Sequence, residues 1–258
     1  ETFFGDKRPF FTEGQQLFDV RFAESGRLVN TRRIGAAPDA GVAGASDVLA
    51  AAKYTGQSGA LEYGIFAALE DDSSEAQGRN FLATRLRRST EDFALGWLGT
   101  WVDRPTRDRE ALVNAVDLDW YPRSAVAVQA RAMRSDLRDG SIDSIGYGAT
   151  AAFRYQPGGS LSQQVEVVWL DDDFNVNDLG YQERADVRRI TSDTTLYRRS
   201  YPEGHWLSAS QWGIKGGAFW NQQGQGLPGW LELRRGLNLR NGDSLTFGAW
   251  HEFSGIDD

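Results

Sequence analysis

The chain has 258 residues, of which 40% are hydrophobic and 25% charged, and its formal net charge is −8 at pH 7. This length suits one large β domain or two ordinary domains. The negative charge argues against a general nucleic-acid-binding protein, because affinity for polyanions comes mainly from clustered Lys and Arg. The absence of cysteine excludes a disulfide framework, a thiol nucleophile and a Cys-ligated zinc ion, and only two histidines are present.

No apolar run approaches the roughly 20 residues that a membrane-spanning helix requires. The sequence therefore excludes a helical membrane protein, but not a membrane β-barrel, whose strands are half polar. The chain begins at Glu1 without Met or a basic-then-apolar leader. We expect either that a signal peptide has been removed or that the chain is a piece of a longer protein.

Residues 1–46 are rich in Gly, Arg and Phe and show little sustained periodicity. One short alternating stretch, residues 17–22, predicts a strand. We interpret residues 1–46 as an N-terminal segment that serves as a plug, a lumenal segment or a linker. Residues 47–258 form the β region.

From residue 47 onward, apolar and polar side chains alternate in segments of roughly ten residues, which predicts half-buried strands. All five prolines beyond residue 100 are expected between strands, because Pro donates no ladder hydrogen bond. The predicted strands are 47–56, 60–70, 78–88, 93–103, 110–120, 124–135, 144–156, 161–171, 187–200, 205–220, 229–239 and 244–254.

The connections between these segments predict how the sheet is arranged. Through the first ten they alternate strictly between short and long, with residues 136–143 among the long ones and 201–204 among the short ones. An up-and-down meander with tight turns at one end and elaborated loops at the other gives this pattern, as in outer-membrane barrels. Strands of about ten residues suit a bilayer, and many aromatic residues stand at segment ends, as in interfacial girdles. The predicted fold is thus all-β, an antiparallel meander of about 12 long strands that forms part of a transmembrane β-barrel.

Two carboxylates on one predicted strand raise the question of catalysis. Asp117 and Asp119 share a face about 6.5–7 Å apart, a spacing within the range of glycosidase acid/base pairs. The competing interpretation is that both line a polar lumen and pair with Arg from adjacent strands. We favour the second interpretation and predict no catalytic residues.

The most acidic stretch is residues 171–178. Asp171, Asp173 and Asn175 resemble the start of a calcium loop, but Val176 replaces the required Gly, which excludes an EF-hand. A solvated acidic loop is the favoured interpretation, an irregular calcium site is the weaker one, and no cofactor is predicted.

Charges of both signs fall on the predicted lumenal face of the strands. Mixed signs predict an internal salt-bridge network that narrows or plugs the lumen rather than a strongly selective pore. The predicted lumenal charges are Glu62, Arg85, Arg87, Asp117, Asp119, Arg131, Arg154, Glu166, Lys215, Glu232 and Arg234.

Three stretches, residues 1–18, 31–35 and 174–181, resemble a family of uncharacterised bacterial outer-membrane-type β-barrel domains that usually follow a family 9 carbohydrate-binding module. The resemblance covers most of the chain in order. The matching residues are Asp6, Lys7, Arg8, Pro9, Phe10, Phe11, Glu13, Gly14, Arg32, Arg33, Asn175, Asn177, Asp178, Gly180 and Tyr181.

The resemblance implies a location and an architecture rather than an activity. It implies a bacterial outer membrane of the Gram-negative type, with a sugar-binding module upstream and further strands downstream. The expected partners are outer-membrane lipid, glycans and the machinery that inserts barrels, but not nucleic acid. The C-terminus lacks the terminal aromatic strand of a complete barrel, so we expect a truncated chain.

The leading hypothesis is therefore a non-enzymatic outer-membrane barrel domain associated with surface glycan binding or uptake. The first alternative is a soluble secreted β-sheet domain that binds carbohydrate. The second is a glycosidase that uses Asp117 and Asp119.

Overall fold

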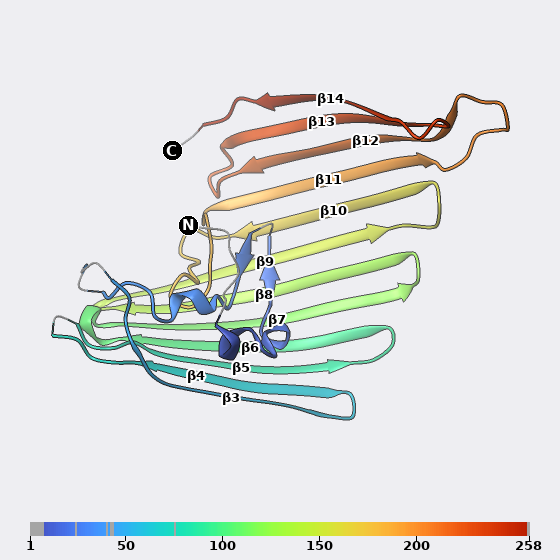
Figure 1. Cartoon of the computed structure of the whole chain (residues 1–258). Coiled ribbons are helices and arrows are strands. Elements are labelled where there is room, and N and C mark those ends of the chain that lie inside the picture. The colour runs from blue at the N-terminus through green and yellow to red at the C-terminus, as the bar shows by residue number, and fades with distance from the viewer. Residues whose placement is uncertain (1–7, 24, 40, 42–43, 75, 257–258) are drawn as a thin grey trace. The chain divides into compact units, whose positions relative to one another are not determined.

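The computed structural model describes residues 8–23, 25–39, 41, 44–74 and 76–256. It contains one antiparallel sheet of twelve strands, in which each strand pairs with its neighbours in sequence from β3 to β14 (Figure 1). This confirms the predicted all-β antiparallel meander, and all twelve predicted segments are strands. They are Val48–Ser58 (β3), Leu61–Glu70 (β4), Asn80–Ser89 (β5), Phe93–Arg104 (β6), Arg109–Arg123 (β7), Val126–Asp139 (β8), Ile142–Tyr155 (β9), Leu161–Leu170 (β10), Val187–Arg198 (β11), Leu207–Trp220 (β12), Gly226–Leu239 (β13) and Ser244–Phe253 (β14).

The chain divides into two compact units. Unit 1 contains residues 8–118 together with Arg131–Gly148 and Leu170–Ala185. Unit 2 contains Asp119–Ala130, Ala149–Trp169 and residues 186–256. Strands β7 to β10 contribute residues to both units, and the N-terminal segment belongs to unit 1.

Short elements make up the N-terminal segment. They are the helix Pro9–Thr12 (α1), the 3-10 turns Gln15–Leu17 (η1) and Thr31–Arg33 (η2), and the paired strands Arg21–Phe22 (β1) and Gly26–Arg27 (β2). The predicted strand at 17–22 is therefore mostly wrong, because a 3-10 turn occupies its beginning.

Aromatic side chains anchor this segment on one face of β4, which we call the covered face of unit 1. The rings of Phe11 and Phe18 lie 5.9 and 6.4 Å from the ring of Phe66. Gly64 makes the approach possible, since a Cβ there would lie 2.8 Å from Leu17 Cδ2 and 2.9 Å from Phe18 Cζ. Phe11, Phe18 and Phe66 are all buried, so the segment and the sheet share one apolar core.

Two predicted connections are wrong. The supposed long connection 136–143 is a two-residue turn at 140–141, where Gly140 adopts a positive φ of 62°. The charges nearby belong to long strands and pair along or across them, as Arg138 does with Asp143. The supposed short turn at 201–204 extends over 199–206, so the strict alternation of loop lengths fails there.

Two prolines were expected between strands and lie inside them. Pro228 belongs to β13, where the pairing with β12 shifts register between Gly217 and Phe219. A bulge of this kind accommodates a residue that donates no ladder hydrogen bond. Pro122 is the penultimate residue of β7, next to a tight hairpin.

Candidate functional site

Side chains alternate between two faces of the sheet. One face is exposed and carries many large apolar side chains, and many polar side chains lie on the other, buried face. In β4, Ile65 is 46% exposed while its neighbour Phe66 is 4% exposed. In β7, Val116 is 47% exposed while Asp117 is 4% exposed. A protein surrounded by water on all sides places such carboxylates outside and such aliphatic groups inside.

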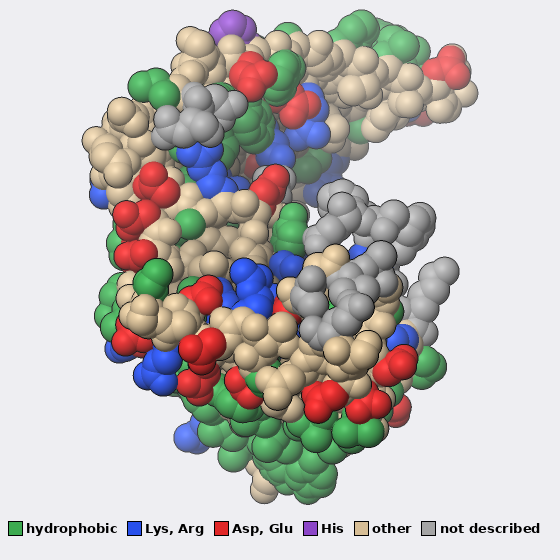
Figure 2. Space-filling model, turned by 90° about the vertical axis from the view of Figure 1, so that its left-hand side faces the viewer, with side chains coloured by type: hydrophobic (Ala, Val, Ile, Leu, Met, Phe, Trp, Pro, Cys, Tyr) green, Lys and Arg blue, Asp and Glu red, His purple; other side chains and the backbone are tan. Residues whose placement is uncertain are grey.

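The exposed apolar face of unit 1 extends over β4 to β7 and β9, whereas β8 carries Ala132, Arg134 and Arg138 on that side. Its large side chains are Ile65, Leu69, Leu86, Leu95, Trp97, Leu112, Val116, Ile145 and Tyr147, each more than a third exposed. In Figure 2, apolar side chains gather at the bottom of the view, over β3 and β4.

Unit 2 has an apolar face of the same kind. Register places Trp212 opposite Leu196, and Ile214 opposite both Thr194 and Leu233, so these side chains share one face. Its large exposed side chains are Phe153, Val167, Trp169, Ile190, Leu196, Trp212, Ile214, Leu231, Leu233, Leu245 and Phe247. Contiguous exposed apolar surface of this extent is typical of a surface that contacts a protein, a membrane or a ligand.

On the covered face of unit 1, one predicted lumenal pair forms a buried ion pair. Arg85 of β5 reaches over β6 to Asp117 of β7 with both terminal nitrogens, one of them at 2.9 Å. Gly96 of β6 leaves the necessary space, because a Cβ there would lie 2.5 Å from the Arg85 guanidinium and 2.7 Å from the Asp117 carboxylate. Arg85 also donates to the carbonyl of Leu17 at 3.1 Å, which ties the N-terminal segment to this pair.

The two aspartates of the glycosidase alternative are both occupied. Asp117 is engaged by Arg85, and Asp119 accepts a hydrogen bond of 2.8 Å from Gln129. Both carboxylates are buried. This arrangement favours a structural role for them over acid/base catalysis.

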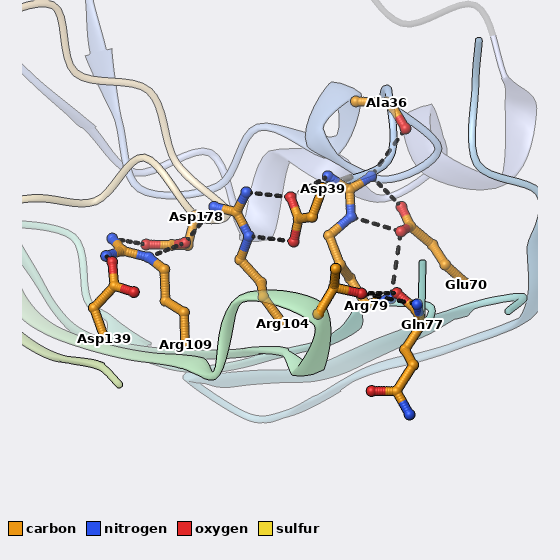
Figure 3. Close-up of polar contacts among 10 residues, drawn as sticks. Ala36, Asp39, Glu70, Gln77, Arg79, Arg104, Arg109, Asp139 and Asp178 are labelled. Atoms are coloured by element: carbon orange, nitrogen blue, oxygen red, sulfur yellow. Dashed lines mark hydrogen bonds and ion pairs between the residues drawn. The ribbon is translucent and has the colours of Figure 1, made fainter. Parts of the chain in front are cut away.

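A chain of buried ion pairs, which we call the ion-pair ladder, runs along the strand ends of unit 1 (Figure 3). Glu70 at the end of β4 binds Arg79 at 2.6 Å. Asp178 accepts from Arg104 at 2.8 Å and from Arg109 at 2.8 and 2.9 Å. Members alternate in sign, so each buried charge has partners of opposite sign; they are Glu70, Arg79, Asp39, Arg104, Asp178, Arg109 and Asp139.

The ladder connects three parts of the chain that are distant in sequence. Asp39 comes from the N-terminal segment, Asp178 from the connection 171–186, and the arginines from the ends of β6 and β7 and the residue before β5. Burial raises the pKa of the Asp178 carboxyl, but the hydrogen bonds and charges of Arg109 and Arg104 more than offset this, so its pKa lies below its ordinary value of 3.8. The balance is the same for Asp39, whose pKa Arg104 lowers despite burial.

The residues of the family resemblance converge on the same region. Arg33 donates to the carbonyl of Gly180 at 3.1 Å and to Asn177 Oδ1 at 3.2 Å. Tyr181 exchanges two backbone hydrogen bonds with Arg27. Residues of separate sequence motifs thus join the N-terminal segment to the connection 171–186 by hydrogen bonds.

Other motif residues fix the segment itself. Arg8 donates to the carbonyls of Ile34 and Thr31 and lies 4.1 Å from the Phe11 ring. Pro9 begins α1, and Phe10 packs against Phe11. Lys53 of β3 binds the carbonyls of Phe10 and Glu13. Gly14 has a positive φ of 63°, Arg32 lies in η2, and Asp6 and Lys7 lie outside the described residues.

The acidic stretch uses its oxygens within the protein. Asp171 Oδ2 accepts from the Tyr147 amide at 2.8 Å, Asp173 Oδ1 from Ser144 Oγ at 3.2 Å, and Asn175 Oδ1 from the Asn177 amide at 2.9 Å. In the part of the chain that the structure describes, no three His, Asp or Glu side chains gather to hold a metal ion. Many Asp and Glu side chains lie at the strand ends that carry this connection (Figure 2).

The opposite face of unit 2, which we call the polar face, carries the remaining predicted lumenal charges. Glu166 binds Arg189 at 2.9 Å, and Arg234 lies 3.3 Å from Glu232 and 3.8 Å from Asp193. Lys215 lies 5.2 Å from the ring of Trp230. Alternation in their strands also points Arg154 to this face of unit 2, and Glu62, Arg87 and Arg131 to the covered face of unit 1.

The sequence did not predict the ion-pair ladder. It also did not predict the uncharged residues of the covered face of unit 1 and of the polar face of unit 2. Glu70, Arg104, Arg109 and Asp139 stand at strand ends, where charged residues are ordinary turn neighbours. No local signal shows that they meet. Gly96, placed between two oppositely charged strands, is a weak signal for the Arg85–Asp117 pair.

No family model, no curated protein and no solved structure matches this chain. None of the described helices has both the length and the apolar character needed to cross a membrane.

Proposed function

We propose that the chain is part of an outer-membrane β-barrel domain associated with surface glycan binding or uptake. One observation carries the proposal: in both units the large apolar side chains of alternating strands are exposed, while carboxylates and guanidinium groups occupy the other face. Lipid is the apolar phase that such a surface suits. The strands β3 and β14 are the edges of the sheet, and in lipid their free edges must be paired, as they are in a closed barrel.

The strand lengths support the same proposal. Each strand from β3 to β13 pairs with the next one in sequence, and each of the twelve strands has at least ten residues. About ten tilted residues span a hydrocarbon core, whereas strands of globular proteins average five or six. On the apolar face of unit 1, Arg88, Glu110 and Arg138 lie near strand ends, whereas Arg134, which pairs with Asp136, stands farther inside β8.

The role of the N-terminal segment follows from its contacts. It fills the covered face of unit 1 and is held there by aromatic packing, by Arg85 and by the ion-pair ladder. We propose that it is a plug. The polar face of unit 2 then faces water, and its charges and hydroxyl groups meet the glycan.

Flotation with lipid vesicles tests the membrane assignment. The chain is refolded from urea into vesicles of phosphatidylcholine and phosphatidylethanolamine and centrifuged under a density gradient. We expect it to float with the vesicles and to remain after alkaline carbonate washing. A chain that stays monomeric in detergent-free buffer and does not float contradicts the proposal and favours the soluble carbohydrate-binding alternative.

The glycosidase alternative has its own test. Asp117→Asn and Asp119→Asn are assayed on chromogenic glycosides against the unchanged chain. Hydrolysis abolished by both replacements, in protein that still floats, would contradict a non-enzymatic role.

A further inference from the structure

Two hollows on the polar face of unit 2 share a wall. One has a volume of about 270 Å³ and the other of about 360 Å³, and the side chains of Tyr197 and Gln211 line both. Sites for small molecules occupy roughly 300–1,000 Å³, so the two hollows together have the size of a ligand site. The other lining residues include Gln164, Asp193, Gly213 and Arg234 in the first hollow, and Arg199 and Gly236 in the second.

Glycines in neighbouring strands create the space. Gly213 of β12 stands opposite Arg234 of β13, and Gly236 of β13 stands opposite Gln211 of β12. A Cβ on Gly236 would lie 2.9 Å from Cγ of Gln211, so a larger residue would displace the Gln211 side chain. The Gln211 side chain therefore lies over Gly236, and at Gly213, where a Cβ would meet its nearest neighbouring atom at 3.5 Å, the lack of a side chain leaves space in the first hollow.

The lining groups determine what chemistry the hollows recognise. They supply hydroxyls, carboxamides and an aromatic ring, which together donate and accept hydrogen bonds and offer one flat apolar surface. In the first hollow the charges are compensated, since Arg234 faces both Asp193 and Glu232, and Glu166 binds Arg189. In the second hollow, Arg199 donates to the carbonyl of Gly159 at 2.7 Å and lies 5.4 Å from the Tyr197 ring. A charged ligand would have to compete with these ion pairs, whereas a neutral polyhydroxylated ligand only adds hydrogen bonds to them.

We propose that the paired hollows bind a neutral oligosaccharide, with the Tyr197 ring as the surface against which a sugar ring lies. Gln211, Gln164 and the Asp193–Arg234 pair hydrogen-bond its hydroxyl groups. This proposal deepens the proposed function, because it names the site and the ligand class on the polar face. It rests on the glycan association stated there.

Binding measurements on the full chain in detergent micelles test the site. The probes are the neutral hexasaccharides of cellulose, xylan, mannan, starch and chitin, and hexagalacturonate as a charged probe, each titrated by isothermal calorimetry. We expect at least one neutral hexasaccharide to bind, and hexagalacturonate to bind at least tenfold more weakly. Tyr197→Ala should weaken binding about tenfold or more, and Tyr197→Phe, which keeps the ring, should retain most of it.

Trp212→Ala is the matched control, because Trp212 follows Gln211 directly but lies on the apolar face. It should leave the affinity within twofold. The site is overturned if no neutral probe binds at millimolar concentration, if hexagalacturonate binds most tightly, or if Tyr197→Ala and Trp212→Ala have equal effects. Flotation is measured on the same samples, so a failed site in a chain that still floats is distinguished from a failed membrane assignment.

Discussion

Both units consist of strands with alternating apolar and polar side chains, but the covered face of unit 1 and the polar face of unit 2 are occupied differently. In unit 1 that face carries small residues such as Gly64, Ala68 and Gly96, and the N-terminal segment covers it. In unit 2 it carries long polar side chains such as Gln164, Lys215 and Arg234, which leave hollows. In unit 1 the small residues thus stand where the N-terminal segment and the Arg85–Asp117 pair approach the sheet, whereas in unit 2 polar side chains line hollows that no other segment fills.

The largest difference in stability between the two units is expected for a replacement of Gly96. Gly96→Val should lower the free energy of unfolding by about 3–5 kcal/mol, because the new side chain separates the buried Arg85–Asp117 pair. Gly213→Val in unit 2 is the matched control, since a Cβ there would lie 3.5 Å from the nearest neighbouring atom. Urea unfolding in vesicles measures both. Equal losses from the two replacements would show that the faces are packed alike.

The ion-pair ladder gives the next largest effect. Asp178→Asn should cost about 3 kcal/mol, because Arg104 and Arg109 lose a shared buried charge. Asp172→Asn, an exposed position in the same connection, should cost less than about 0.5 kcal/mol.

The same variant tests how the contribution of Asp178 to stability depends on pH. Because the folded-state pKa of Asp178 is lowered, its contribution is present above the ordinary value of 3.8 and is lost as pH falls through the folded-state pKa. Stability curves of the unchanged chain and of Asp178→Asn should therefore converge in acid. Curves that stay parallel down to the lowest pH measured would contradict this.

On the apolar face the expected effect is of similar size and depends on depth in the bilayer. Ile214→Arg should destabilise the chain in vesicles by about 2–4 kcal/mol, since charge on the lipid-facing side of a barrel is costly. Thr246→Arg, on the polar face of β14 opposite Gly236, should change stability by less than about 1 kcal/mol. A neutral or stabilising Ile214→Arg would indicate that water covers this face.

The sequence predicted the strands well because alternation is local. In residues 61–70, the large side chains of Leu61, Tyr63, Ile65 and Leu69 stand at odd positions, and the pairing with β5 extends without a bulge, so they share a face. The position of Pro228 inside a strand was not predicted, because a bulge depends on the partner strand. The connection at 140–141 was predicted too long, because charged residues at strand ends resemble those of a loop.

The site was less predictable because it depends on contacts between distant residues. Asp39, Arg104 and Asp178 are far apart in sequence and meet only after the N-terminal segment and the connection 171–186 fold onto the strands. The hollows at Tyr197 depend on glycines in two neighbouring strands, and pairing register alone brings these together.

Spin-label accessibility along β12 tests the central assignment most directly. The chain has no cysteine, so single cysteines at residues 211–216 can each carry one label without background. In vesicles, we expect labels at 212, 214 and 216 to be relaxed mainly by dissolved oxygen, and labels at 211, 213 and 215 mainly by a water-soluble nickel complex. Preferential relaxation by the nickel complex at all six positions would contradict the account.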